Sequence, residues 1–131
     1  MNTYLLDTNV VSYLFRGHSL GSTYQSMIQG VRPAISFMTI AELHEGALRA
    51  GWGSTKLQRL DTEIAKYVVV HSSDDQCRIW GEIRAARRQQ PISVDDAWIA
   101  AAAVELSLPL VTHNRADFDG IPNLTVISAS P

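Results

Sequence analysis

Short apolar runs alternate with longer segments of helical spacing along almost the whole chain, and this alternation constrains the fold more than any other feature. The apolar or β-branched runs cover residues 4–6, 34–36, 67–70, 110–112 and 125–127. Helical segments are expected at 9–15, 23–29, 39–50, 56–66, 74–89 and 93–106, and residues 17–22 are expected to form a loop. Strands that alternate with helices predict an α/β domain with a five-stranded, mainly parallel sheet.

The last of these helices carries an alanine-rich face. Ala97, Ala100, Ala101 and Val104 follow the i, i+3, i+4, i+7 spacing of a helix that turns one side to a core. Because most of these side chains are single methyl groups, the helix is expected to lie close to the sheet.

Size and composition fit one compact domain over residues 1–131. Hydrophobic residues make up 46% and charged residues 18% of the chain, which argues against a disordered protein. The chain has no apolar stretch long enough to span a bilayer, and residues 1–7 lack the basic and apolar segments of a secretory signal, so none is expected. With Cys77 as its one cysteine, expected to be buried in a helix, it can form no internal disulfide, and a cytoplasmic location is expected.

Four acidic residues lie just beyond strands or near helix starts: Asp7, Glu42, Asp96 and Asp117. The carboxyl ends of parallel strands form the crevice where open α/β sheets bind ligands, so these side chains could converge there. Like charges gathered in one place repel unless a cation balances them. An all-oxygen site suits Mg²⁺ or Mn²⁺ better than zinc, and the four histidines show no metal-ligand spacing.

A purely structural interpretation of these acids remains open. Glu42, Asp96 and Asp117 each follow a possible helix cap by three residues, namely Thr39, Ser93 and Asn114, and Asp7 could itself be a cap. Taken singly, each acid is more readily explained as structural. The repeated placement of all four favours a functional site. Asp96 is preferred to Asp95 because it lies at the edge of the expected packed face. Glu42 is preferred to Glu45 because it lies one turn before Gly46, which has no side chain, whereas Glu45 can pair with Arg49 on the surface.

Four segments closely resemble motifs of the PIN domain, in the order of that family. They are Leu-Leu-Asp-Thr-Asn-Val at 5–10, Thr-Ile-Ala-Glu-Leu at 39–43, Asp-Ala-Trp-Ile-Ala-Ala at 96–101 and Leu-Val-Thr-His-Asn-Arg-Ala-Asp-Phe at 110–118. The resemblance implies a three-layer α/β/α sandwich with the first and fourth strands adjacent. It also implies that Asp7, Glu42 and Asp96 are metal-coordinating, catalytic acids, supported by Thr8 and Asn9.

The resemblance also bears on the rest of the site. Thr112 would be a polar neighbour of the metal, and Asn114 would face Asp7. The fourth acid is Asp117 of the Asp-Phe pair, while Asn114 stands where many relatives have Asp.

In length and motif wording the chain is most similar to the VapC toxin ribonucleases of bacterial type II toxin-antitoxin pairs. This likeness implies hydrolysis of RNA by water activated on one or two Mg²⁺ or Mn²⁺ ions, a cognate antitoxin partner and a homodimer. The antitoxin would bind the helical pair around residues 39–66, where Trp52, Leu57 and Leu60 form an apolar patch or part of the core.

Arginines near the end of the 74–89 helix could contact RNA. Arg84, Arg87 and Arg88 share one side of the helix, and we expect Arg84 or Arg87, together with Arg115, to bind phosphates. The alternative is a solvated face whose cations favour the helix end. A net charge of −2 argues against bulk coating of nucleic acid.

Other functions fit the sequence less well. An aspartate-nucleophile phosphatase needs Asp where the chain has Asn9, and a serine hydrolase needs a G-x-S-x-G motif, which is absent. The alternative that remains is a PIN-fold binding module, weak or inactive as an enzyme, that engages RNA or a protein.

Overall fold

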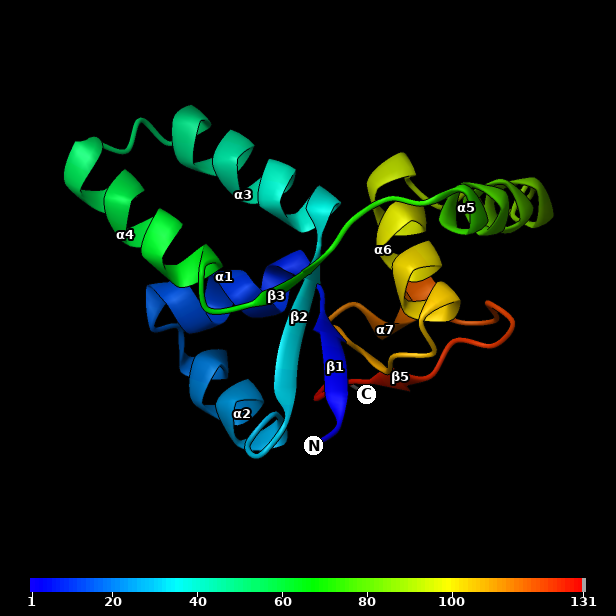
Figure 1. Cartoon of the computed structure of the whole chain (residues 1–131), viewed down its shortest axis with the longest axis horizontal. Helices are drawn as coiled ribbons and strands as arrows, with labels where there is room; N and C mark the ends of the chain where they lie inside the picture. Colours follow the sequence, from blue (N-terminus) through cyan, green and yellow to red (C-terminus); the bar gives the residue numbers. More distant parts are fainter. Residues whose placement is uncertain (131) are drawn as a thin grey trace.

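The computed structural model describes residues 1–130 and confirms the α/β class (Figure 1). Its elements are β1 (Thr3–Leu6), α1 (Thr8–Arg16), α2 (Ser19–Met27), β2 (Arg32–Ser36), α3 (Phe37–Arg49), α4 (Ser54–Ile64), β3 (Val68–Val70), α5 (Asp74–Ala86), α6 (Val94–Glu105), β4 (Leu110–Val111), α7 (Arg115–Phe118) and β5 (Val126–Ile127). In this described part of the chain, no helix is both long and apolar enough to cross a membrane.

The five strands form one sheet in the order β3-β2-β1-β4-β5, and every neighbouring pair is parallel. The chain builds outward from β1 to β3 on one side, then returns to place β4 on the other side of β1. The strand order therefore reverses between β1 and β4, as the resemblance implied. The crevice beyond their carboxyl ends is the place where such sheets bind ligands.

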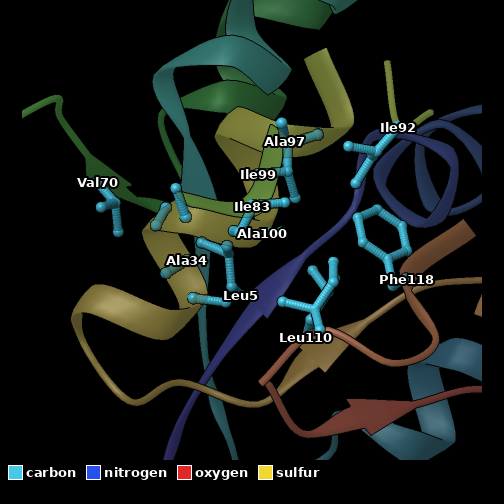
Figure 2. Packing of buried hydrophobic residues seen from close by; sticks show 14 residues of the cluster. Leu5, Ala34, Val70, Ile83, Ile92, Ala97, Ile99, Ala100, Leu110 and Phe118 are labelled. Carbon is cyan, nitrogen blue, oxygen red and sulfur yellow. The ribbon is translucent and has the colours of Figure 1, made fainter. Parts of the chain in front are cut away.

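Successive residues of the central strands point to opposite faces of the sheet and belong to two separate hydrophobic cores. Leu5, Ala34 and Leu110 face α5, α6 and α7, where Figure 2 shows them near Ala97 and Ala100 of α6. These two alanines are fully buried, as the spacing predicted. Because alanine adds only a methyl group, α6 can approach the sheet closely.

The alternate residues Leu6, Ile35 and Val111 face the opposite side of the sheet and pack against α1 and α2. Figure 1 shows these helices and α5–α6 on opposite sides of the sheet, with α3 and α4 as an antiparallel pair that extends beyond it. The three-layer α/β/α sandwich is thus confirmed. It follows from the two-residue period of a strand that is buried on both faces.

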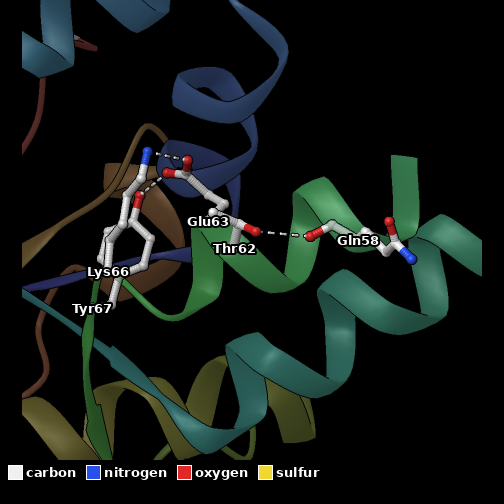
Figure 3. Close-up of polar contacts among 5 residues, drawn as sticks. All are labelled: Gln58, Thr62, Glu63, Lys66 and Tyr67. Atoms are coloured by element: carbon white, nitrogen blue, oxygen red, sulfur yellow. Dashed lines mark hydrogen bonds and ion pairs between the residues drawn. The ribbon is translucent and has the colours of Figure 1, made fainter. Parts of the chain in front are cut away.

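The end of α4 is tied to the start of β3 by polar contacts (Figure 3). Glu63 accepts hydrogen bonds from Lys66 Nζ at 3.1 Å and from the Tyr67 hydroxyl at 2.7 Å, while the Thr62 hydroxyl donates to the Gln58 carbonyl at 3.1 Å. Burial, and then the neighbouring Glu63 carboxylate, raise the pKa of Tyr67, which stays a neutral donor.

Several local predictions are wrong. The expected loop at 17–22 is partly helical, because α2 begins at Ser19 and the His18 ring accepts a hydrogen bond from the Leu20 N–H at 3.0 Å. Helix α5 ends at Ala86 rather than at residue 89, and Cys77 is exposed. The single turn α7 was not predicted, since four residues are too few to show a helical period.

Gly21 allows α1 and α2 to touch. A Cβ atom at Gly21 would lie 2.8 Å from the Tyr13 carbonyl oxygen, which is a backbone atom that cannot rotate away. We expect Gly21→Ala to lower the free energy of unfolding by about 1–3 kcal/mol because the helices must shift apart. Urea denaturation measures the change.

The matched control is Gly46→Ala in α3, where an added Cβ meets no atom within 4 Å. This exposed helix position should gain roughly 0.5–1 kcal/mol from the replacement of glycine. Equal behaviour of the two variants would contradict the proposed close contact.

Candidate active site

Asp7 lies at the point where the strand order reverses. Its backbone N–H donates to the Val111 carbonyl at 2.8 Å, and its side chain is only 5% exposed. One carboxylate oxygen accepts from the Thr8 N–H at 2.8 Å and the other from the Thr112 hydroxyl at 2.7 Å. The Thr112 hydroxyl in turn accepts from the Asn114 N–H at 3.0 Å. Residues after β1 and after β4 therefore hold this carboxylate in one orientation.

Glu42 reaches the same region from the second turn of α3. The Thr8 hydroxyl lies 2.6 Å from Glu42 Oε1 and 3.0 Å from the Thr39 hydroxyl. Because Thr8 has one hydroxyl proton, it donates to the carboxylate and accepts from Thr39. Asp7 and Glu42 are thus linked through Thr8, whose N–H donates to Asp7 and whose hydroxyl donates to Glu42.

Asp96 and Asp117 approach from the other side of the sheet. Asp96 occupies the first turn of α6, and its N–H donates to the Ser93 hydroxyl at 3.0 Å. Asp117 is exposed and belongs to α7. A cavity of about 450 Å³ is lined by both carboxylate residues, together with Ser93 and Arg87.

Burial and neighbouring acids raise the pKa values of three of these residues. Burial first, and then Asp7 and Asp117, raise the pKa of Asp96 to about 6. Burial first, then Asp95, Asp7 and Asp96, raise the pKa of Glu42 to about 7. Burial, with a smaller contribution from Asp117, also raises the pKa of Asp7, against the lowering effect of its hydrogen bonds. Asp117 thus acts on Asp7 and Asp96, and Asp7 acts on Asp96 and Glu42, so the four predicted acids lie close enough to be called one acidic cluster.

The acidic cluster does not form a complete set of protein ligands for a metal ion. Across residues 1–130, no three His, Cys, Asp or Glu side chains form a group that could hold an ion by themselves. The donor chemistry nonetheless fits a hard divalent cation: Mg²⁺ usually keeps several waters and takes only one or two protein carboxylates. A cation would also relieve the repulsion between buried carboxylates that their raised pKa values report.

The structural explanation of the acids is right in part. Asp7 caps α1 and Ser93 caps α6 ahead of Asp96. Thr39 is not a cap, because α3 begins two residues earlier and is capped by Ser36. Thr39 is instead fully buried and contacts Thr8. A cap and a functional acid can be the same residue, so the two interpretations do not exclude each other.

The supporting residues predicted from sequence lie around Asp7. Thr8 and Thr112 hydrogen-bond the cluster directly, and Asn9 Oδ1 accepts from the His113 N–H at 3.4 Å. The Asn114 backbone is engaged by Thr112, while its side chain is exposed and makes no capping hydrogen bond.

Some neighbours of the site were missed by sequence reasoning. Asp95, which was set aside in favour of Asp96, affects Glu42 more strongly than Asp96 does. The buried Tyr24 hydroxyl lies 2.6 Å from His113 Nδ1 and accepts from the Ala129 N–H at 3.2 Å. No local pattern predicts contacts between residues so far apart in the chain.

Two predicted RNA-contact arginines bind backbone carbonyls. Arg84 donates to the Ile92 carbonyl at 2.6 Å. Arg87 donates to the carbonyls of Gln90, Asp117 and Asp119 at 3.0, 2.7 and 2.9 Å. Arg87 therefore fastens the end of α5 to the segment that carries Asp117, whereas Arg115 is half-buried on α7 itself.

Removal of the Arg87 guanidinium group, which donates three hydrogen bonds to backbone carbonyls, should make residues 115–119 more mobile. We expect Arg87→Ala to lower the free energy of unfolding by about 1–2 kcal/mol and to speed amide hydrogen exchange over this segment. Arg78→Ala on the same helix removes only a surface ion pair with Asp75 and should cost less than about 1 kcal/mol. Equal stability and equal exchange in the two variants would contradict the fastening role.

The raised pKa values set a pH dependence for the metal-free protein. The folded chain holds protons on Asp96 and Glu42 up to about 6 and about 7, against ordinary values of 3.8 and 4.5. Since the folded state binds these protons more tightly than the unfolded state does, the protonated acids stabilise the fold. This stabilisation is lost as pH rises through the window. With a chelator present, the melting temperature should be higher near pH 5.5 than near pH 8.

Glu42→Gln should flatten that profile, because the amide does not titrate. Glu45→Gln, which alters an exposed acid paired with Arg49 on the same helix, should keep the wild-type profile. Thermal unfolding over the pH range compares them. A wild-type melting temperature that falls on mild acidification would show that the cluster does not behave in this way.

Comparison with known proteins places this site in a family. The PIN domain family model matches residues 4–124. The chain is 31% identical over 129 residues to the ribonuclease VapC5 of Mycobacterium tuberculosis, covering 94% of this chain and 93% of the relative. It is 28% identical over 125 residues to the ribonuclease VapC1 of Haemophilus influenzae strain R2866, covering 92% and 93%.

The solved structures agree with the sequence matches. The crystal structure of VapBC2 from Rickettsia felis, bound to a DNA fragment from its promoter, contains a chain with a TM-score of 0.83 and 27% identity. The match covers 96% of this chain and 98% of that one. Together, the family match over residues 4–124, the relatives and the shared fold show that the chain belongs to the PIN domain family.

Proposed function

We propose that this chain is a divalent-metal-dependent endoribonuclease that acts as the toxin of a toxin-antitoxin pair. The observation that carries this proposal is the group of acids around Asp7 whose pKa values are raised by burial and by neighbouring acids of the group, at the point where the strand order reverses. Relatives similar to the chain over more than nine-tenths of its length are named as VapC ribonucleases, which supports RNA as the substrate.

Asp7, Glu42, Asp96 and Asp117 would hold one or two Mg²⁺ or Mn²⁺ ions, with water completing the coordination. When bound, such an ion supplies a more acidic water and balances negative charge on the phosphate. Thr8 and Thr112 hold the carboxylates of Asp7 and Glu42 in place, so that little reorganisation is needed on binding. Asn9 and Asn114 complete the polar surroundings.

The proposal extends to partners. Solved VapBC assemblies among the structural neighbours support a cognate antitoxin, for which the projecting α3–α4 pair is the proposed binding face. Trp52 and Leu57 remain half-buried there, while Leu60 belongs to the buried interior. We also propose a homodimer and a cytoplasmic location, where RNA is available. The family match over residues 4–124 supports one domain.

A second candidate is a binding module with this fold and little turnover. The absence, within residues 1–130, of three acids at metal-holding spacing favours it, as does Asn114 where many relatives have Asp. Such a module would bind RNA or a protein without cutting RNA. The two candidates differ in whether RNA is cleaved when metal is added.

Asp7→Asn should separate the two. We expect this variant to lose more than about 100-fold in metal-dependent cleavage of a mixed RNA pool, because it removes the charge of a direct metal ligand, whereas loss of a supporting partner alone typically costs less. Asp61→Asn, which alters an exposed acid on α4, should retain wild-type activity. Cleavage is followed by gel electrophoresis with Mg²⁺, with Mn²⁺ and with a chelator.

The outcomes are distinct. Cleavage that survives in Asp7→Asn or in chelator would count against metal-dependent turnover at this site. RNA binding without cleavage by the folded wild-type protein would support the binding module instead.

A further inference from the structure

Two pockets meet over the turn that joins α5 to α6. The first, of about 450 Å³, contains Asp96 and Asp117 of the acidic cluster. The second, of about 480 Å³, is lined by Trp80, Arg84 and Arg88. Both are also lined by Arg87, Pro91 and Ile92, so they are neighbours that share one wall. The set of residues that lines the two pockets, from Asp96 and Asp117 in the first to Trp80, Arg84 and Arg88 in the second, is here called the arginine path.

The arginines of this path differ in how much of their hydrogen-bonding capacity is free. A guanidinium group has five N–H donors. Arg87 uses three of them on backbone carbonyls, and Arg84 uses one. Arg88 is exposed, and within residues 1–130 it has no hydrogen-bond or ion-pair partner. Arg88 is therefore the cation of the path with the most capacity for an incoming anion.

An aromatic surface lies beside these cations. The Trp80 ring stacks on Trp98 with centroids 5.2 Å apart and planes tilted by 23°, and its N–H donates to the Val94 carbonyl at 3.3 Å. The Arg84 guanidinium lies 5.5 Å from the Trp80 ring centroid. These contacts, with Pro91 nearby, give a firm apolar wall next to positive charge. Arginines beside aromatic rings are typical of grooves that bind single-stranded nucleic acid without reading its sequence.

We propose that the arginine path binds the single-stranded RNA segment that flanks the bond to be cut. Arg88, with the free N–H groups of Arg84 and Arg87, neutralises backbone phosphates, while Trp80 and Pro91 contact a ribose or a base. In this proposal a strand that follows the second pocket and crosses the shared wall reaches Asp96 and Asp117 in the first. This inference rests on the proposed ribonuclease function, and it gives Arg84 and Arg87 a mainly structural role and Arg88 the main phosphate contact.

Arg88→Gln tests the path because it removes a charge from an exposed position without breaking a side-chain hydrogen bond or ion pair made within residues 1–130. Its matched control is Arg78→Gln, an exposed arginine of α5 that lines neither pocket. Binding of a fluorescent single-stranded oligouridylate of about 12 nucleotides is measured by anisotropy, in chelator so that no cleavage occurs. Circular dichroism checks that all proteins are folded.

We expect Arg88→Gln to weaken binding roughly three- to tenfold and to reduce the slope of log K against log salt by about 0.7. Arg78→Gln should bind as the wild type does. Equal affinities and equal slopes for the two variants would overturn the proposal. A second result would also overturn the proposal: Arg88→Gln binds RNA as the wild type does but no longer binds an oligoglutamate peptide. That result would make the path a protein-binding surface.

The binding result is separable from the proposed function. If Asp7→Asn abolishes cleavage but Arg88→Gln leaves binding unchanged, the nuclease assignment stands and the arginine path fails. If the wild type binds RNA through Arg88 but never cleaves it, the path stands and the nuclease assignment fails.

Discussion

The hydrogen bond from the Thr112 hydroxyl to Asp7 joins the carboxyl ends of β1 and β4, and the site depends on it. These residues are 105 positions apart in the chain and meet because β4 pairs with β1, although β2 and β3 lie between them in the sequence. The same hydroxyl accepts from the Asn114 N–H, and the backbone of Asp7 is bound to Val111. One buried carboxylate is therefore fixed from both sides of the place where the strand order reverses.

Burial of several acids close together costs stability in the absence of a cation. The raised pKa values of Asp7, Glu42 and Asp96 all have burial as their first cause and neighbouring carboxylates as a further one. A structure selected only for stability would not keep such a group, because each of these acids is easier to ionise in water. Perturbed acids of this kind cluster at functional sites, which is why their arrangement supports a metal-dependent enzyme.

The arginines illustrate how residues with the same helical spacing can have different surroundings in the fold. Arg84, Arg87 and Arg88 share one side of the helix in the sequence pattern, from which Arg84 or Arg87 is expected to contact phosphate. The structure gives Arg87 three backbone carbonyls and Arg84 one, whereas Arg88 lies beyond the end of α5. The difference arises in the turn between α5 and α6. The helical spacing of the sequence does not predict the conformation of this turn.

Much of the architecture could be predicted from the sequence, because it follows from short-range patterns. Runs such as Tyr-Leu-Leu at 4–6 favour strands, the alanine spacing of α6 predicts a closely packed helix, and alternation of the two predicts the parallel sheet. The errors lie where the signal is weak: the start of α2, the single turn α7 and the exposure of Cys77.

The sequence by itself determined the fold class and singled out four acidic residues as candidates for the site, since both follow from residue type and local spacing. Only the tertiary structure decided that Thr39 supports Thr8 instead of capping α3, that Asp95 acts on Glu42, and that Arg87 holds the segment of Asp117. Each of these is a contact between distant parts of the chain. Such contacts depend on how helices and strands are oriented in space, which local spacing does not encode.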